Sequence, residues 1–273
     1  MKKIAIFGLV IFWSSPLLAQ EFLGTRGLAM GEALRGSLLL NDAIYFNPAA
    51  MGPTKKYSLE AQTVFNPTRD QELGYNISLI DTRGTSIGAG FGYSGGKIKT
   101  EGEKSEWRHF FNLSLAQPIS DLLSVGATSK FALFDEEKLK GHANADFGVI
   151  IFPGPYKEYF QIGAVIHNLA KDEKAFPRQI GVGTRINIMK ELGFTVDVVK
   201  PVSENRWIFG VGGEFVHGSG LLARAGFHYD SLEPPAYSLG VGYFKNQVGV
   251  SYSFRNWVDN KLQTHGLSVS MFF

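Results

Sequence analysis

The chain has no cysteine among its 273 residues, so no disulfide can stabilise the fold and no lipid can be attached to a thiol behind a leader. It also lacks any apolar run of the length that a transmembrane helix requires. The formal net charge of +2 is close to neutral and gives no reason to expect a nucleic-acid partner. Its six histidines are not spaced with carboxylates as metal ligands are, so we expect neither a metal nor another cofactor.

The N-terminus has the pattern of a secretory signal peptide. Met1 is followed by two lysines, an apolar run over residues 4–13 and small residues that end at Ala19. This order of a basic, an apolar and a small-residue region predicts export and cleavage after Ala19, which leaves Gln20 as the first residue. The chain then divides into a signal peptide over 1–19, a non-repetitive segment over 20–56 and a strand-rich region over 57–273.

From residue 57 onward, apolar side chains alternate with small or polar ones, which is the pattern of two-faced strands. Ile180 and Val182, for example, alternate with Gly181 and Gly183. The composition of 32 glycines and 13% aromatic residues suits strands with one small face and one apolar face. Counting the runs predicts about fourteen strands, centred near residues 61, 76, 89, 112, 128, 148, 163, 183, 195, 211, 225, 240, 251 and 267.

The connections between these strands alternate in length. The odd-numbered ones are longer and charged, and include residues 95–105, 135–142, 168–176, 201–205, 230–235 and 255–261. The even-numbered ones are tight, apart from residues 152–158. Outer-membrane barrels have short periplasmic turns and longer outer loops, and an even strand number returns both chain ends to the periplasm. We therefore predict an all-β fold, a transmembrane antiparallel β-barrel of about fourteen strands. A soluble β-sandwich, the alternative, predicts no such alternation.

The apolar faces are typical of a barrel surrounded by lipid. Aromatic residues such as Trp107, Trp207 and Tyr237 fall near strand ends, where membrane barrels carry their interfacial girdles. The last strand alternates up to Phe273, and this ending resembles the signal that the barrel-assembly machinery recognises. We expect the outer membrane of a Gram-negative cell as the location, with its lipid and the assembly machinery as partners.

The segment before the strands carries a further resemblance. Residues 26–31 read RGLAMG, residues 41–43 read NDA, and residues 46–49 are Phe46, Asn47, Pro48 and Ala49. These stretches resemble the N-terminal segment of the long-chain fatty-acid transporter (FadL) superfamily, which includes the PorV-like barrels. The resemblance is close over residues 24–52 and extends to the rest only as a fourteen-strand barrel. It implies that the segment is a hatch inside the lumen, with Phe46 and the Asn-Pro-Ala turn as its gate.

Physical reasoning agrees with a hatch over residues 20–56. A barrel of about fourteen strands is wider than the eight-strand barrels that side chains fill, so something must close it. The segment is rich in glycine and alanine, and this low bulk lets it approach the wall closely. Loop parity predicts that it starts in the periplasm; a flexible periplasmic leader peptide is the alternative. The outer loops are shorter than those of the fatty-acid transporters, which argues against a surface capture site.

Several charged residues fall on the inward faces of the predicted strands, and we assign them to a polar network in the lumen: Glu60, Asp146, Arg185, Asp197, Glu214, Arg224 and His228. Unpaired charges in a narrow lumen are costly, so we expect the arginines to pair with the wall carboxylates or with Glu32 and Asp42 of the hatch. Bonding between wall and hatch is favoured over ligand recognition.

We do not expect an enzyme. Glycine pairs at 88–92, 181–183, 210–212 and 240–242 recur mid-strand with no helix after them, so a phosphate-binding loop is excluded and room for the hatch is the better explanation. His217 and Ser219 share one turn, which does not provide the geometry of nucleophile, base and orienting group.

These observations lead to one hypothesis and two alternatives. The hypothesis is passive uptake of small hydrophobic molecules, such as fatty acids, past the hatch. One alternative is a non-transporting, PorV-like barrel that docks partner proteins at its rim, which the compact loops favour. The other is a structural or aqueous-pore role.

Overall fold

The computed structural model describes residues 22–68, 72–84, 86–98, 106–134, 140–154, 159–170, 176–258 and 262–273. The predicted signal peptide and its cleavage site after Ala19 lie outside these ranges. So do residues 99–105, 135–139 and 171–175, which belong to the predicted loops at 95–105, 135–142 and 168–176. Within the described ranges, every helix is too short or too polar to cross a membrane.

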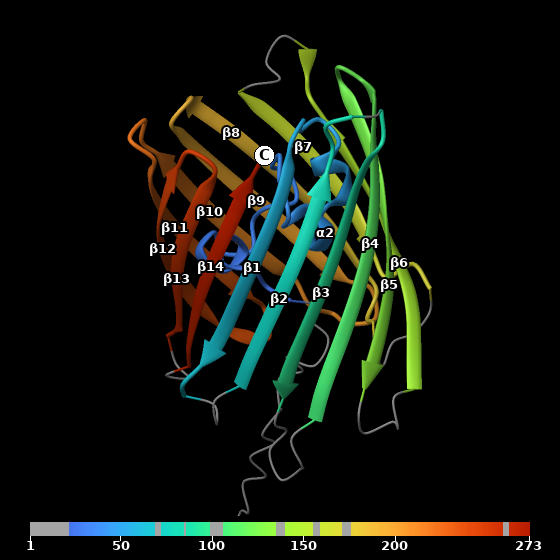
Figure 1. Ribbon diagram of the computed structural model, residues 1–273. Coiled ribbons are helices and arrows are strands. Elements are labelled where there is room, and N and C mark those ends of the chain that lie inside the picture. Colours follow the sequence, from blue (N-terminus) through green and yellow to red (C-terminus); the bar gives the residue numbers. More distant parts are fainter. Residues whose placement is uncertain are drawn as a thin grey trace, which may run out of the picture.

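Fourteen strands form one closed antiparallel barrel, in which each strand pairs with its neighbours in sequence and β1 pairs with β14 (Figure 1). The strands are β1 (Tyr57–Asn66), β2 (Glu72–Asp81), β3 (Gly88–Ile98), β4 (Glu106–Ser120), β5 (Leu123–Phe134), β6 (Lys140–Ile151), β7 (Phe160–His167), β8 (Gln179–Met189), β9 (Leu192–Pro201), β10 (Ile208–Val216), β11 (Leu221–Asp230), β12 (Glu233–Lys245), β13 (Val248–Trp257) and β14 (Gln263–Phe272). Three short helices precede them: α1 (Thr25–Ala29), α2 (Ala43–Phe46) and the 3-10 helix η2 (Pro48–Met51). The predicted antiparallel β-barrel of about fourteen strands is confirmed.

The barrel has two different ends. The turn end, uppermost in Figure 1, holds the start of β1, the C-terminus and the even-numbered connections. The odd-numbered connections lie at the opposite end, the loop end. Four of these connections are shorter than predicted, because β3 continues to Ile98, β6 begins at Lys140, β12 begins at Glu233 and β13 continues to Trp257. Arg255 therefore belongs to a strand and not to a connection.

The two faces of the wall differ as the alternation predicted. Large apolar side chains on the outer face are exposed, for example Ile77 at 54% and Leu113 at 55%. Their sequence neighbours Asn76 and Ser114 point inward and are exposed by 1% and 0%. An apolar surface that surrounds the whole wall would be unfavourable in water, and it is the surface that outer-membrane barrels present to lipid.

Residues 22–52, which we call the plug, fill the middle of the lumen; they include the blue coils behind β1 and β2 in Figure 1. The inward glycines make room for it. A Cβ on Gly210 would lie 2.4 Å from the carbonyl oxygen of Gly31, and one on Gly92 would lie 2.2 Å from the hydroxyl of Tyr45. Gly31 itself has a φ of 62°, which only glycine adopts without strain.

The described part of the plug does not begin where loop parity predicted. The ring of Phe22 would meet a Cβ of Gly74 at 3.6 Å, and Gly74 lies near the loop end of β2. Loop parity counts only the strands that cross the membrane. The plug is not among them, because it runs from the loop end to the turn end inside the lumen. The expectation that the segment starts at the periplasmic, turn end is therefore wrong for the described residues.

Candidate functional site

A cavity of about 320 Å³ lies between the plug and the loop end of the barrel. Its volume is at the lower end of the ~300–1,000 Å³ that is common for small-molecule sites. Phe22, Tyr45 and Phe46 of the plug border it on the side of the turn end. The wall contributes further apolar side chains, among them Val64, Phe110, Val199, Ile208, Trp257 and Leu262. The cavity can therefore hold a small molecule with a largely apolar surface.

Only one of the four predicted gate residues borders this cavity. Phe46 does so, and the guanidinium of Arg35 lies 5.4 Å from the centre of its ring. Asn47 and Ala49 are 0% exposed, and Pro48 is buried at the first position of η2. The other three residues are thus placed to hold the plug and not to contact a ligand in the cavity.

Asn47 connects three parts of the molecule. Its Nδ2 donates to the carbonyl oxygen of Arg35 at 2.9 Å and to that of Val149 in β6 at 3.1 Å. Its Oδ1 accepts the backbone N–H of Ala49 at 3.2 Å and so caps η2. One amide thereby fixes the fold of the plug and its position on the wall.

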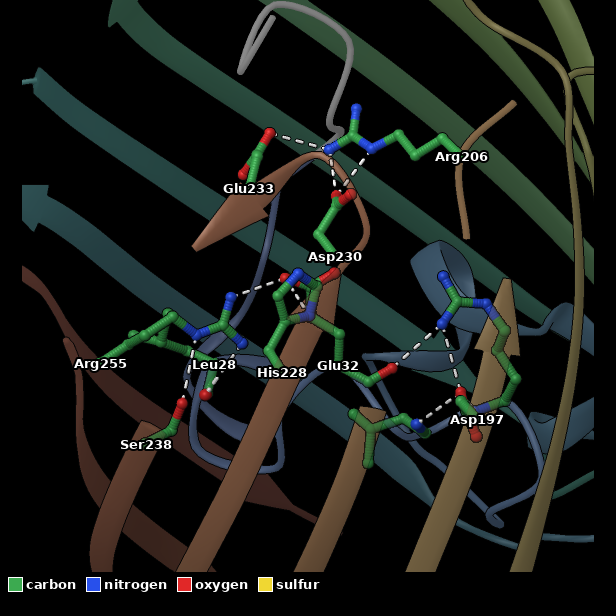
Figure 2. Close-up of polar contacts among 11 residues, drawn as sticks. Leu28, Glu32, Asp197, Arg206, His228, Asp230, Glu233, Ser238 and Arg255 are labelled. Carbon is green, nitrogen blue, oxygen red and sulfur yellow. Dashed lines mark hydrogen bonds and ion pairs between the residues drawn. The ribbon is translucent and has the colours of Figure 1, made fainter. Parts of the chain in front are cut away.

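The polar side of the site is centred on Glu32, which lies between Arg255 and His228 in Figure 2. Arg255 Nη1 donates to Glu32 Oε1 at 2.6 Å, and the same guanidinium binds the carbonyl oxygen of Leu28 and the hydroxyl of Ser238, each at 3.2 Å. Burial alone would raise the pKa of Glu32, but His228 and Arg255 outweigh burial and lower it to about 2. Glu32 is therefore ionised at neutral pH and joins the plug to β11 and β13.

Asp197 of β9 forms a second anchor, also shown in Figure 2. Its Oδ2 accepts the backbone N–H of Leu34 at 3.0 Å and that of Arg35 at 2.8 Å, and it pairs with the Arg35 guanidinium at 3.2 Å. These bonds satisfy backbone donors that would otherwise be buried without partners.

Arg206 lies at the loop-end rim of the cavity, between Asp230 and Glu233 (Figure 2). Its Nε donates to Asp230 at 2.7 Å and its Nη2 to Glu233 at 2.8 Å. These bonds hold the connection between β9 and β10, which contains Arg206, against the ends of β11 and β12. They therefore set the shape of the cavity entrance.

A third anchor lies nearer the turn end. Arg26 of the plug, Arg185 of β8 and Arg224 of β11 reach the carboxylate of Glu214 at 2.9, 3.2 and 2.8 Å. The predicted pairing of both wall arginines with a wall carboxylate is present. Glu60 faces inward on β1, opposite Ser270 and Ser78 in the register of its neighbours.

Asp146 belongs to a separate cluster on the other side of the barrel. It pairs with Lys130 at 2.6 Å and with His167 Nδ1 at 2.8 Å, and Lys130 also donates to Asn168 at 3.0 Å. The predicted network is thus several groups and not one. The sequence reading missed Lys130, His167 and Arg255, although the outward run of Tyr252 and Phe254 places Arg255 on the inner face.

The remaining polar candidates lie away from the cavity. His217 and Ser219 share a hydrogen bond of 2.8 Å in the exposed turn between β10 and β11. Across the described ranges, no group of three or more histidine, aspartate or glutamate side chains is placed to hold a metal ion.

No protein-family model and no curated protein matches the sequence. Solved structures do match. The CymD monoaromatic hydrocarbon channel has a TM-score of 0.71 at 13% identity, over 92% of this chain and 96% of that one. The toluene transporter TbuX of Ralstonia pickettii has 0.69 at 13% identity, over 94% and 98%. A Pseudomonas aeruginosa FadL homologue has 0.67 at 13% identity, over 92% and 98%.

The fold is that of the FadL-type channels. The resemblance read from residues 24–52 is thus consistent with the whole barrel. At such low identity the likeness concerns the fold of these FadL-type structures, and the activity of this chain has to be argued from its own cavity and plug.

Proposed function

We propose that this chain is an outer-membrane channel that admits small hydrophobic molecules by passive diffusion, with the plug acting as a hatch. The observation that carries the proposal is the cavity at the loop end, which lies directly on plug residues Phe22, Tyr45 and Phe46. Two of the matching structures, a monoaromatic hydrocarbon channel and a toluene transporter, favour single-ring compounds as the substrate class. Export through the leader over 1–19 and assembly through Phe273 belong to the same proposal.

The route we favour runs through the lumen. β3 pairs with β2 and with β4 without a break in register, over Ala89–Lys97 and Gly88–Ile98. In the described strands the register shifts only near strand ends, at Pro118/Ser120, Asn187/Met189 and His228/Asp230. A molecule in the cavity thus meets the plug as its nearest movable barrier, and a shift of the plug opens the way to the turn end.

Uptake by whole cells tests this function. We expect cells that carry the barrel to take up radiolabelled ethylbenzene several-fold faster than cells that lack it. Ile208→Asn, which makes the cavity wall polar, should lower the rate, because a buried amide without a partner disfavours an apolar ligand. Leu122→Asn, in the exposed turn between β4 and β5, is the control and should transport normally. Equal uptake with and without the barrel would refute the proposal.

The second candidate is a PorV-like barrel that docks partner proteins. Exposed apolar side chains in the loop-end connections favour it, namely Val202 at 51%, Leu232 at 52% and Val258 at 56%. A stoichiometric partner that co-purifies from gently solubilised membranes, and is lost when Leu232 is changed to Ser, would support docking. Uptake of ethylbenzene would not depend on that partner.

A further inference from the structure

The phenol side chain of Tyr45, in the plug, lies in a notch of the barrel wall. The hydroxyl of Tyr45 accepts a hydrogen bond of 2.5 Å from Asn76 Nδ2 of β2. The notch exists because residue 92 of β3 is glycine, since a Cβ there would lie 2.2 Å from the Tyr45 oxygen. The ring of Phe22 lies edge-on to that of Tyr45, with 6.4 Å between the centroids. The wall is thus shaped to receive an aromatic ring that carries a hydroxyl.

The notch has more hydrogen-bonding capacity than Tyr45 uses. Asn76 Oδ1, Ser94 Oγ and both amide atoms of Asn112 are buried, and none has a hydrogen-bond partner among the described residues. These residues are neighbours, because Asn76 is the register partner of Ser94, and Gly92 that of Asn112. Buried polar atoms without partners are costly, and native proteins keep few of them unless a ligand or water satisfies them. These unpartnered atoms lie on β2, β3 and β4, on the part of the wall around Gly92.

The notch adjoins the cavity. Tyr45 and Ser94 both line it, together with Phe22 and Phe46. Rotation of the Tyr45 side chain into the cavity would open the notch without moving the backbone of α2. A ligand in the cavity can then take the place of the Tyr45 ring.

We propose that this notch, formed by Asn76, Gly92, Ser94 and Asn112, is a recognition site for small phenols. The inference rests on the proposed function and names its preferred substrate class. A bare hydrocarbon in the notch would leave the amide and hydroxyl groups without partners. A carboxylate would lose its hydration among neutral groups, since the nearby Lys130 is already paired with Asp146. A flat ring that carries a neutral hydroxyl fits both the shape of the notch and the polarity of the groups that line it.

A matched pair of ligands tests the inference. 4-Ethylphenol and ethylbenzene differ only by the hydroxyl, and their binding to the purified barrel is measured by equilibrium dialysis, with cellular uptake in parallel. Wild type should bind 4-ethylphenol about tenfold more tightly, the ratio that about 1.4 kcal/mol gives. Tyr45→Phe should increase this preference, because the competing hydroxyl is gone. Asn76→Leu and Gly92→Ala should abolish the preference, by removing the donor and by filling the notch.

Ser253→Ala is the control, because its hydroxyl is also buried without a partner among the described residues but lies on β13. It should keep the wild-type preference. Folding of each variant is checked by the heat-dependent shift in gel mobility that folded barrels show. Equal binding of the two ligands by wild type, or a preference that survives in both Asn76→Leu and Gly92→Ala, would overturn the phenol site. If neither ligand enters cells through wild type, the proposed transport function fails instead.

Discussion

The two halves of the plug are held in different ways. The first half, residues 22–37, is bound to the wall by charges, through Arg26, Glu32 and Arg35. The second half, residues 38–52, is held by apolar packing, with Ile44 and Met51 both 0% exposed, and by hydrogen bonds from Asn41 and Asn47 to the wall. The same apolar cluster also includes Met30 and Leu34 of the first half. The second half meets β4, β5 and β6 through η2, whereas α1 of the first half meets β11 to β14 and β1.

This difference separates an anchor from a movable part. Apolar packing is short-ranged, and its loss exposes apolar surface, so the second half should stay in place. Breaking a buried ion pair is costly when it leaves a charge without a partner, but Glu214 keeps Arg185 and Arg224 as partners when Arg26 leaves it. We therefore infer that the first half moves when the hatch opens, and that the second half remains on the wall.

Removing the whole plug should have the largest effect. Deletion of residues 22–52 should convert the barrel into an open pore, because both halves that fill the lumen are gone. Single-channel recording in planar bilayers should show a conductance several-fold above that of wild type. An unchanged conductance in a correctly folded deletion variant would mean that the plug does not seal the lumen.

Asn47→Ala should weaken the second half most among single substitutions. It removes two hydrogen bonds to backbone carbonyls and the cap of η2, a loss of about 3 kcal/mol. Hydrogen exchange of residues 43–51 should become faster by about two powers of ten. Asn41→Ala, which loses one bond to Ser78, is the matched control and should cost about 1 kcal/mol. Equal effects of the two changes would contradict the central position of Asn47.

Glu32→Gln should loosen only the first half. It leaves Arg255, which is 1% exposed, without its carboxylate, and we expect a local loss of about 2 kcal/mol. Exchange of residues 28–36 should accelerate about thirtyfold while residues 43–51 keep their rates. Glu204→Gln, at the exposed rim, is the control. Equal acceleration in both halves would show that the plug moves as one body.

Acid should produce a smaller version of the same effect. The pKa of Glu32 is lowered from 4.5 to about 2, so its contribution to stability is fully present above about pH 4.5 and is lost as the pH falls through about 2. The protection factors of the first half, that is, the exchange rates of the unstructured chain relative to its own at the same pH, should therefore fall over this interval in wild type. The acid effect should be absent in Glu32→Gln, and its persistence there would assign it to another group.

The sequence was sufficient for the architecture but not for the site. Alternation such as Ile180 and Val182 against Gly181 and Gly183 predicts the barrel, because one face must meet lipid and the other the plug. Pairing inside the lumen depends on contacts between residues far apart in the chain. Nothing near Glu32 in sequence indicates that Arg255 will bind it. The role of Tyr45 was missed for the same reason, since Asn76 and Gly92 lie on other strands.

A reversible lock tests most directly whether the first half moves. The hydroxyl oxygens of Thr25 in the first half and Ser268 in β14 lie 2.9 Å apart, so cysteines at these two positions would point toward each other, as a disulfide requires, and the chain has no other cysteine to interfere. In Thr25→Cys/Ser268→Cys, we predict that oxidation lowers ethylbenzene uptake to the level of cells without the barrel and that reduction restores it. Uptake that is equally fast in the oxidised and reduced protein would contradict the account.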